Sequence, residues 1–282
     1  MMVSGATTHI AIQDLRERGL VNVNYPDVLR GAVEKAVDSW KFFCQLPREE
    51  KLAFEFLEDS HGDGAGYELK VADGTDRKEN FHVSLFQSKR LQKIANQRSL
   101  AFLTDAQDLL DKMEPLILQF AECVEQAYDI QGFKDEVKMC KQYWMLRYLH
   151  YFGDQKEGIE IAAPHTDKGG FTLHLYETDE GLQYFCIPSR QWKPMPVDKQ
   201  QTVIISGLQL QLASEGRIKA LYHRVIATEK SASIGRFAVV CFISLENRPG
   251  YNKKGYGNTQ SHQVGFNYDL PHPEFAKYFL KR

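Results

Sequence analysis

His165 and Asp167, which are separated by a single residue, are the side chains of this chain best suited to hold a metal ion. On an extended segment, residues two apart project from the same side, so both side chains reach the same space. A second histidine, His223, lies far downstream in another apolar segment. Two imidazoles and one carboxylate on one face of a metal leave several coordination positions open. This ligand set is typical of Fe(II) sites that react with oxygen.

The triplet alone does not decide the question, because an H-x-D pattern is short and the chain has nine histidines. A single histidine on a strand is more often a hydrogen-bonded structural residue than a metal ligand. The residues that surround the triplet carry more information. Short motifs follow it in a fixed order: Gly181-Leu-Gln-Tyr184, Trp192, Pro196, Thr202-Val-Ile-Ile205, Gly207-Leu-Gln-Leu-Gln211, Ser214-Glu-Gly216, Tyr222-His-Arg-Val225 and Arg236.

This ordered series resembles the iron/ascorbate-dependent oxidoreductase family. That family comprises the 2-oxoglutarate-dependent dioxygenases related to isopenicillin N synthase and the plant flavonoid and hormone oxygenases. The resemblance extends upstream to residues 19–24, 46–51, 66–67 and 76–81, and it therefore covers the chain from residue 19 to residue 245. It is specific for the family and uninformative about the substrate.

The resemblance implies a fold, an activity and roles for particular residues. The fold is a double-stranded β-helix, or jelly roll, in which His165, Asp167 and His223 hold Fe(II). The co-substrate is 2-oxoglutarate, whose far carboxylate is anchored by Arg236 and assisted by Tyr151. A guanidinium suits this task because it binds a carboxylate through two parallel hydrogen bonds. Ascorbate is implied as a possible reductant, and O2 and a small organic molecule as substrates.

Two further residues, Phe81 and His82, correspond to a stretch that borders the substrate pocket in the resembled family. We therefore name both as residues that contact the substrate. A histidine at such a position is more commonly on the surface.

The chain departs from the family pattern at two places in the co-substrate region. The family's Arg-x-Ser reads Arg236-Phe237-Ala238, so a hydroxyl group is missing. The family's Asn-Tyr-Tyr reads Leu149-His150-Tyr151. Both changes leave the metal ligands intact, and both predict weaker binding of 2-oxoglutarate than is usual in the family.

Composition excludes several classes of partner. The 35 basic and 37 acidic residues give a formal net charge of −2, and no long basic run occurs, so neither nucleic acid nor an anionic membrane is an expected partner. No apolar run approaches the length of a membrane span, and the N-terminus does not resemble a signal peptide. Five scattered cysteines with no C-x-x-C pair favour reduced thiols and a cytoplasmic location.

Periodicity divides the 282 residues into three regions of a single domain. Residues 1–142 are mainly helical and are expected to pack on a barrel. Thr104 with Gln107 resembles a capping box, and Pro115 is expected to kink the helix that follows or to begin its second part. Residues 143–246 contain short runs of β-branched and aromatic residues separated by turns, which predict the Fe(II)/2-oxoglutarate jelly-roll core. Residues 247–282 are expected to form a segment that closes over the barrel.

Two other functions remain open on the sequence. One is an oxidase of the same fold that uses no 2-oxoglutarate, which the residues Leu149 and Ala238 favour. The other is a ligand-binding jelly-roll protein without catalytic turnover, which the intact metal triad disfavours. A metal-dependent hydrolase is the weakest alternative, because such sites seldom combine with this placement of arginine and tyrosine.

Overall fold

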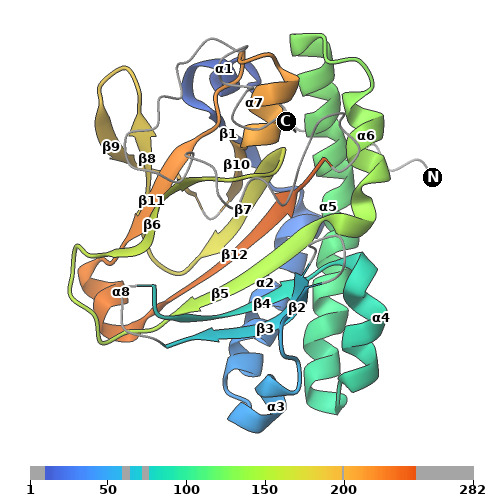
Figure 1. The fold of residues 1–282 in the computed structure, drawn as a ribbon, viewed down its shortest axis with the longest axis vertical. Helices are drawn as coiled ribbons and strands as arrows, with labels where there is room; N and C mark the ends of the chain where they lie inside the picture. Colours follow the sequence, from blue (N-terminus) through green and yellow to red (C-terminus); the bar gives the residue numbers. More distant parts are fainter. Residues whose placement is uncertain (1–9, 59–63, 72–75, 199, 246–282) are drawn as a thin grey trace.

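Two antiparallel β-sheets face each other, and helices cover the outer face of the larger sheet (Figure 1). This computed structural model describes residues 10–58, 64–71, 76–198 and 200–245. Its architecture confirms the jelly-roll core flanked by N-terminal helices that the sequence predicts. The expected closing segment, residues 247–282, lies outside the described residues.

The larger sheet has eight strands in the order β1-β10-β7-β12-β5-β4-β3-β2. Its strands are β1 (Leu20–Asn24), β2 (Leu57–Glu58), β3 (Gly64–Lys70), β4 (Lys78–Val83), β5 (Met145–Tyr151), β7 (Phe171–Glu177), β10 (Gln201–Ser206) and β12 (Arg236–Ile243). The smaller sheet has the order β6-β11-β8-β9, with strands β6 (Glu160–Thr166), β8 (Leu182–Cys186), β9 (Gln191–Pro194) and β11 (Tyr222–Ile226).

Two long helices, α2 (Asp27–Cys44) and α5 (Gln97–Tyr128), pack on each other and back the larger sheet (Figure 1). Shorter helices connect the strands or extend this layer. They are α1 (Gln13–Arg18), α3 (Arg48–Leu52), α4 (Leu85–Ile94), α6 (Phe133–Met139), the 3-10 turn η1 (Lys141–Tyr143), α7 (Leu208–Ala213) and α8 (Glu229–Ile234).

Successive side chains of each strand in the larger sheet point alternately to the hydrophobic core and to a pocket between the sheets. On β12, Val239, Cys241 and Ile243 pack into the core shared with the helices. The alternate residues of the same strand, such as Arg236 and Ala238, line a pocket between the two sheets. Because side chains on a strand point alternately to opposite faces, one strand builds both the hydrophobic core and the pocket wall.

An aromatic cluster joins the helices to the sheet. Phe43 of α2 and Phe102 of α5 each lie 5.1 Å, centroid to centroid, from Phe81 of β4. Trp40 packs against Phe102 at 5.6 Å, and its indole nitrogen donates to the backbone carbonyl of Leu149. Edge-to-face contacts of this kind add to the hydrophobic burial of the rings. The cluster therefore fixes the position of β4 and β5, which carry pocket residues on their other face.

The N-terminal region does more than pack on the barrel. Strand β1 pairs with β10, and β4 pairs with β5, so strands from residues 1–142 belong to the same sheet as the jelly-roll strands. The expected boundary at residue 143 is therefore not a boundary in the sheet. The long apolar stripe of α5 dominates the sequence pattern of this region and conceals the short strands, which carry few residues each.

Helix α5 begins earlier than the sequence pattern predicts. Its capping box consists of Asn96 and Ser99, whose side chains bond the first-turn backbone, and the expected box at Thr104 is wrong. The helix then continues through Pro115 to Tyr128 as one element of 32 residues. The burial of fourteen side chains along one face supplies enough tertiary packing to outweigh the hydrogen bond that proline removes.

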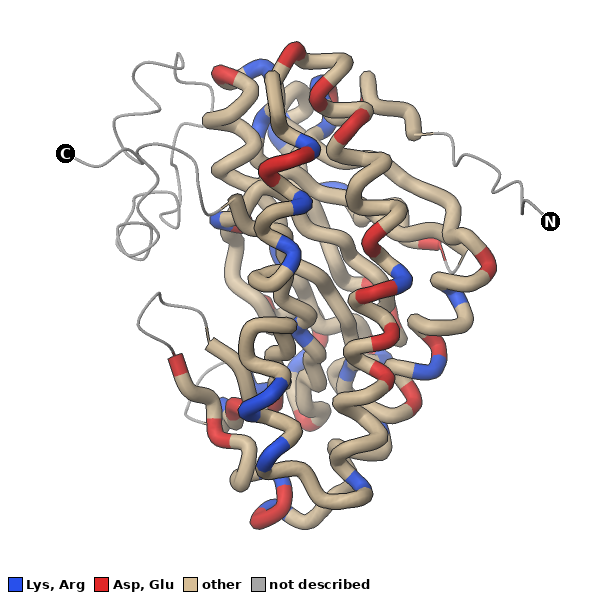
Figure 2. The backbone as a smooth tube through the Cα atoms, turned by 90° about the vertical axis from the view of Figure 1, so that its right-hand side faces the viewer, with Lys and Arg blue, Asp and Glu red and all other residues tan. Residues whose placement is uncertain are grey.

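Acidic and basic residues are intermixed on the side of the molecule covered by α4, α5 and α6, and neither sign gathers there (Figure 2). The described part of the chain contains no helix that is both long enough and apolar enough to cross a membrane. All five cysteines lie in this part of the chain, and no disulfide joins them.

A buried carboxylate, Glu79, ties four elements together at one end of the larger sheet. Its oxygens lie 2.7 Å from Lys51 Nζ, 2.8 Å from the Tyr67 hydroxyl and 2.8 Å from His150 Nδ1. Burial alone would raise the pKa of Glu79, but these hydrogen bonds outweigh it and lower the pKa to about 2. The carboxylate therefore stays ionised and stabilises the fold.

We expect Glu79→Gln to lower the free energy of unfolding by about 3 kcal/mol at pH 7, because it leaves the Lys51 ammonium buried without a counter-charge. The pKa of Glu79 is lower in the folded state than its ordinary value of 4.5. The stabilisation is thus complete above pH 4.5 and is lost as the pH falls toward 2. Urea unfolding of both proteins across this range measures the difference.

Glu122→Gln is the matched control, because Glu122 pairs with Lys134 on the surface and such a pair contributes less than about 1 kcal/mol. A difference between wild type and Glu79→Gln that stays constant down to pH 2 would contradict this account.

Candidate metal and co-substrate site

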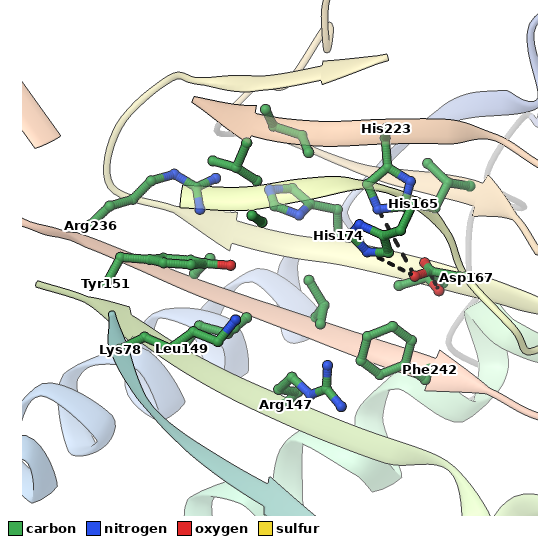
Figure 3. Close-up of a pocket in the computed structure, with 17 residues that line it drawn as sticks. Lys78, Arg147, Leu149, Tyr151, His165, Asp167, His174, His223, Arg236 and Phe242 are labelled. Atoms are coloured by element: carbon green, nitrogen blue, oxygen red, sulfur yellow. Dashed lines mark hydrogen bonds and ion pairs between the residues drawn. The ribbon is translucent and has the colours of Figure 1, made fainter. Parts of the chain in front are cut away.

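The pairing of β6 with β11 brings two histidines side by side. His165 lies directly opposite His223 in this antiparallel register, and their ring centroids are 4.4 Å apart. Asp167 follows the end of β6, and its Oδ1 lies 3.7 Å from His165 Nε2 and 3.9 Å from His223 Nε2. The structure therefore brings together all three residues that the sequence pairs in a metal site, as Figure 3 shows.

Hydrogen bonds to the far side of each ring orient the two imidazoles. His165 Nδ1 lies 2.8 Å from the backbone oxygen of Ala163, and His223 Nδ1 lies 3.1 Å from that of Leu221. A carbonyl oxygen can only accept, so each Nδ1 carries the proton and donates it. The Nε2 lone pairs then face Asp167, which is the tautomer that a metal ligand requires.

Thr172 of β7 holds the aspartate. Its hydroxyl donates to Asp167 Oδ2 over 2.6 Å, which leaves Oδ1 facing the two histidines. The potential ligand atoms of His165, Asp167 and His223 all lie within 4.8 Å of one another, so a single ion can contact all three. Imidazole nitrogens with one carboxylate suit a divalent first-row metal such as Fe(II).

A buried arginine occupies the opposite end of the same pocket. Arg236, at the start of β12, is 1% exposed. Its Nε donates to the backbone oxygen of Asp179 over 3.1 Å, and one terminal nitrogen pairs with Glu177. Burial opposes ionisation of Glu177, but His174 and Arg236 together hold its pKa below the ordinary value. The ion pair explains how a full charge is tolerated at this depth.

Tyr151 and Lys78 complete this basic end of the pocket. Tyr151 lies opposite Arg236 in the β12–β5 register, and the guanidinium carbon is 5.9 Å from the centre of its ring. Lys78 lies opposite Tyr151 on the neighbouring strand, with its ammonium 5.1 Å from the same ring and an ion pair to Asp76. Leu149 and Ala238, where the family pattern is not met, also line the pocket.

The structure places Phe81 and His82 differently from our expectation. Phe81 is fully buried in the aromatic cluster and does not line the pocket, because β4 turns it toward the helices. His82 projects to the other face of β4, is 5% exposed, and packs edge-on against Phe56. Neither residue contacts the pocket in this structure.

Sequence reasoning missed four polar residues that line the pocket: Lys78, Arg147, Thr172 and His174. The alternation rule could have found them. Arg147 and Tyr151 lie an even number of residues apart on β5, and His174 has the same parity as Thr172 on β7. His174 bonds Glu177 over 3.0 Å and thereby supports Arg236 indirectly.

A second cluster of potential metal ligands consists of Cys44, Glu79 and His150. Here the carboxylate already accepts hydrogen bonds from Lys51 and Tyr67. Burial raises the pKa of the Cys44 thiol, with Glu79 adding to the effect, so the thiol stays protonated. A protonated thiol is a poor metal ligand, and this cluster is a structural network.

Comparison with known proteins now decides the family. The 2OG-Fe(II) oxygenase superfamily matches residues 140–245. A 2-oxoglutarate-Fe(II) type oxidoreductase, hxnY of Emericella nidulans, is 28% identical over 85% of this chain and 75% of its own length. Residues 140–245, which form most of the jelly-roll core, belong to the 2OG-Fe(II) oxygenase superfamily, and the relatives support the family predicted from the sequence.

Two further comparisons, one with a curated relative and one with a solved structure, show how far the similarity extends. The 2-oxoglutarate-dependent dioxygenase caaD of Aspergillus niger is 35% identical, but the match spans 35% of this chain and only 30% of the relative. The crystal structure of Neurospora crassa T7H in complex with alpha-KG and 5-formyluracil superimposes with a TM-score of 0.69 at 19% identity, covering 83% of this chain and 76% of that one. This structure shows a shared fold.

Membership of the superfamily confirms the enzyme class predicted from the sequence, an oxidoreductase of the 2-oxoglutarate-dependent dioxygenase type. It also confirms the two cofactors, Fe(II) and 2-oxoglutarate, and the geometry of His165, Asp167 and His223 fits the metal. The use of ascorbate stays a prediction.

We expect His223→Ala to abolish stoichiometric Fe(II) binding, because it removes one of three protein ligands. Iron content after anaerobic loading and desalting measures the effect. His174→Ala is the control, since His174 lines the same pocket but bonds Glu177 rather than facing the triad. Unchanged iron content in His223→Ala would remove this histidine from the ligand set.

Thr172→Val keeps the shape of the side chain and deletes the hydroxyl that orients Asp167. Loss of such an outer hydrogen bond typically costs about 10-fold to 100-fold in metal affinity, and we expect a loss in this range. Competition for Fe(II) with a chelator of known affinity measures it. If the affinity of the variant equals that of the wild type, Thr172 does not orient the ligand.

Proposed function

We propose that this protein couples the decarboxylation of 2-oxoglutarate and the reduction of O2 to the oxidation of a small or medium-sized organic molecule. The observation that carries the proposal is the convergence of two sites on one pocket. The metal triad lies at one end of this pocket, and the buried Arg236 lies with Tyr151 at the other end. A purely structural metal site would not need a buried arginine in the same cavity, and Arg236 is only 1% exposed.

Bound Fe(II) would supply a metal that coordinates the keto acid and reacts with O2. The protein side chains position and protect that chemistry. His165 and His223 are held in one tautomer by Ala163 and Leu221, and Asp167 is oriented by the hydroxyl of Thr172. A third of the His165 side chain, 34%, is exposed, so this ligand stands at the mouth through which a substrate can enter.

Arg236 would bind the far carboxylate of 2-oxoglutarate. Its Nε and one terminal nitrogen are engaged by Asp179 and Glu177, which leaves the second terminal nitrogen for a ligand. Tyr151 offers a hydroxyl from the facing strand, and Lys78 adds a second positive charge near the ring. The ammonium of Lys78 partly compensates for the hydroxyl missing at Ala238, whereas Glu177 reduces the charge that Arg236 offers.

The remaining wall of the pocket is largely apolar. Its side chains come from both sheets and include Leu182, Ile205, Val225, Val240 and Phe242. Together with the polar groups they surround about 660 Å³, counting the space at the open mouth. A mostly apolar pocket with a few polar groups suits a small organic substrate rather than a macromolecule. Apolar walls also keep water away from the site where the oxidation takes place.

A second function, oxidation without 2-oxoglutarate, is favoured by one observation. Arg236 already has a carboxylate partner in Glu177, and Ala238 supplies no hydroxyl. In such an oxidase the arginine would be part of the scaffold, and the organic substrate would fill the metal positions that 2-oxoglutarate otherwise takes.

Anaerobic titration of the Fe(II)-loaded protein with 2-oxoglutarate tests the proposal through a weak metal-to-ligand charge-transfer band. We expect saturable binding in the wild type and none in Arg236→Ala. Ala238→Ser should tighten binding by about ten-fold or more, because a hydrogen bond to a charged group contributes about 1.5–3 kcal/mol.

The two variants form a matched pair, since they change the same subsite in opposite directions. A wild type that shows no saturable band at millimolar 2-oxoglutarate would contradict the proposal and favour the oxidase. If Arg236→Ala binds 2-oxoglutarate as tightly as the wild type does, the assignment of Arg236 as the anchor is contradicted and the proposed function is not.

A further inference from the structure

Arg147 of β5 is a cation of the pocket wall that forms no contact ion pair with any described residue. Its Nε is shielded from solvent and has no hydrogen-bond partner, and no described carboxylate lies within 4 Å of its guanidinium. The other basic residues that line the pocket differ in this respect. Arg236 pairs with Glu177, and Lys78 pairs with Asp76. A shielded polar atom without a partner is costly, and such atoms mark sites where a ligand completes the hydrogen bonding.

The guanidinium of Arg147 is held in place by stacking. Its central carbon lies 4.8 Å from the ring centre of Phe242, which also lines the pocket. Arg147 precedes Tyr151 by four residues on β5, so the two lie about 13 Å apart along the strand. Figure 3 shows Arg147 and Phe242 on the side of Asp167, away from Arg236 and Tyr151. The pocket therefore has two basic subsites with the metal triad within reach of both.

A second unpartnered atom lies beside Arg147. His82 stands opposite Arg147 in the β4–β5 register, and its Nε2 is buried without a hydrogen-bond partner. Burial and the cations Arg147, Lys70 and Lys78 lower the pKa of His82 well below its ordinary value, so the ring is neutral. The neutral ring therefore adds no charge beside Arg147.

The walls around Arg147 are otherwise apolar, with Leu149, Val240 and Phe242 nearest along the neighbouring strand positions. Lys168 is the other cation within electrostatic range of Arg147. Asp167, the acidic residue of this end, already accepts from Thr172 and faces the two histidines. Asp167, Glu68 and Asp76 attract Arg147 through space, but none of them pairs directly with its guanidinium, and each has another partner.

We propose that Arg147 binds a carboxylate of the organic substrate, and that the substrate is consequently a small carboxylic acid with an apolar body. The claim that this acid is oxidised rests on the proposed function, whereas its binding does not. A planar guanidinium matches a carboxylate through two parallel hydrogen bonds, and a single negative charge balances a single arginine. The apolar walls accommodate the rest of the molecule.

The test compares acids with their uncharged amides. Phenylacetate and 3-phenylpropionate, each beside its amide, and phenyl phosphate are titrated by calorimetry into the anaerobic protein loaded with Fe(II), with and without 2-oxoglutarate. We expect at least one acid to bind about ten-fold or more tightly than its amide, because only the acid neutralises the half-buried guanidinium. Arg147→Met should lose this preference while its affinity for 2-oxoglutarate changes by less than about two-fold.

Arg224→Met is the matched control. Arg224 is also a stacked guanidinium, 4.3 Å from the ring of Trp192, but it pairs with Glu160 and lies outside the pocket lining. It should keep the preference for the acid. Arg147→Lys retains the positive charge but cannot form two parallel hydrogen bonds to one carboxylate. It should therefore still prefer the acid to the amide, but bind the acid more weakly. This variant carries the test if Arg147→Met does not fold.

Several results would overturn the proposal. They are equal binding of every acid and its amide by the wild type, a preference that persists in Arg147→Met, or tighter binding of phenyl phosphate than of either acid. Loss of 2-oxoglutarate binding in Arg147→Met would assign the residue to the co-substrate instead. Failure of the wild type to bind 2-oxoglutarate would refute the proposed function alone, because the preference for acids is also measured with Fe(II) only.

Discussion

The register between β6 and β11 is the constraint on which the site depends. It sets His165 directly opposite His223, and a shift by one residue would turn every side chain of one strand to the other face. Asp167 can meet both rings only because β6 ends just before it and Thr172 of the next strand holds its second oxygen. The metal site is thus built mainly by backbone pairing, and the hydrogen bonds around it set the tautomers and the carboxylate orientation.

The two arginines of the pocket wall differ in whether a carboxylate of the protein pairs with them. Arg236 is neutralised by Glu177, which is in turn bonded to His174, so this end holds a stable internal network. Arg147 is left with a stacking partner and no counter-ion. A group that the fold itself satisfies contributes to stability. A group that the fold leaves unsatisfied lowers stability and is better explained by a ligand.

The sequence predicted the jelly roll and its metal residues because both leave local signals. The H-x-D spacing and the short strands with turns can be read directly, and the ordered motifs reach far along the chain. It failed where contacts depend on pairing between distant strands. The residues around Glu177 do not predict its ion pair with Arg236, and those around Lys78 do not predict that its ammonium lies above the Tyr151 ring. Phe81, named as a substrate contact, packs in the aromatic cluster instead. The start of α5 was missed because Asn96 and Ser99 form a cap with less familiar residues than Thr104 and Gln107.

The central claim is that one pocket holds a metal on His165, Asp167 and His223 and 2-oxoglutarate on Arg236. A crystal structure of the protein with Mn(II) in place of Fe(II) and with 2-oxoglutarate would test it most directly. The account predicts anomalous scattering from manganese between these three side chains, with the far carboxylate of 2-oxoglutarate on Arg236 and Tyr151. Manganese bound at Cys44, Glu79 and His150, or 2-oxoglutarate seated on Arg147, would contradict it.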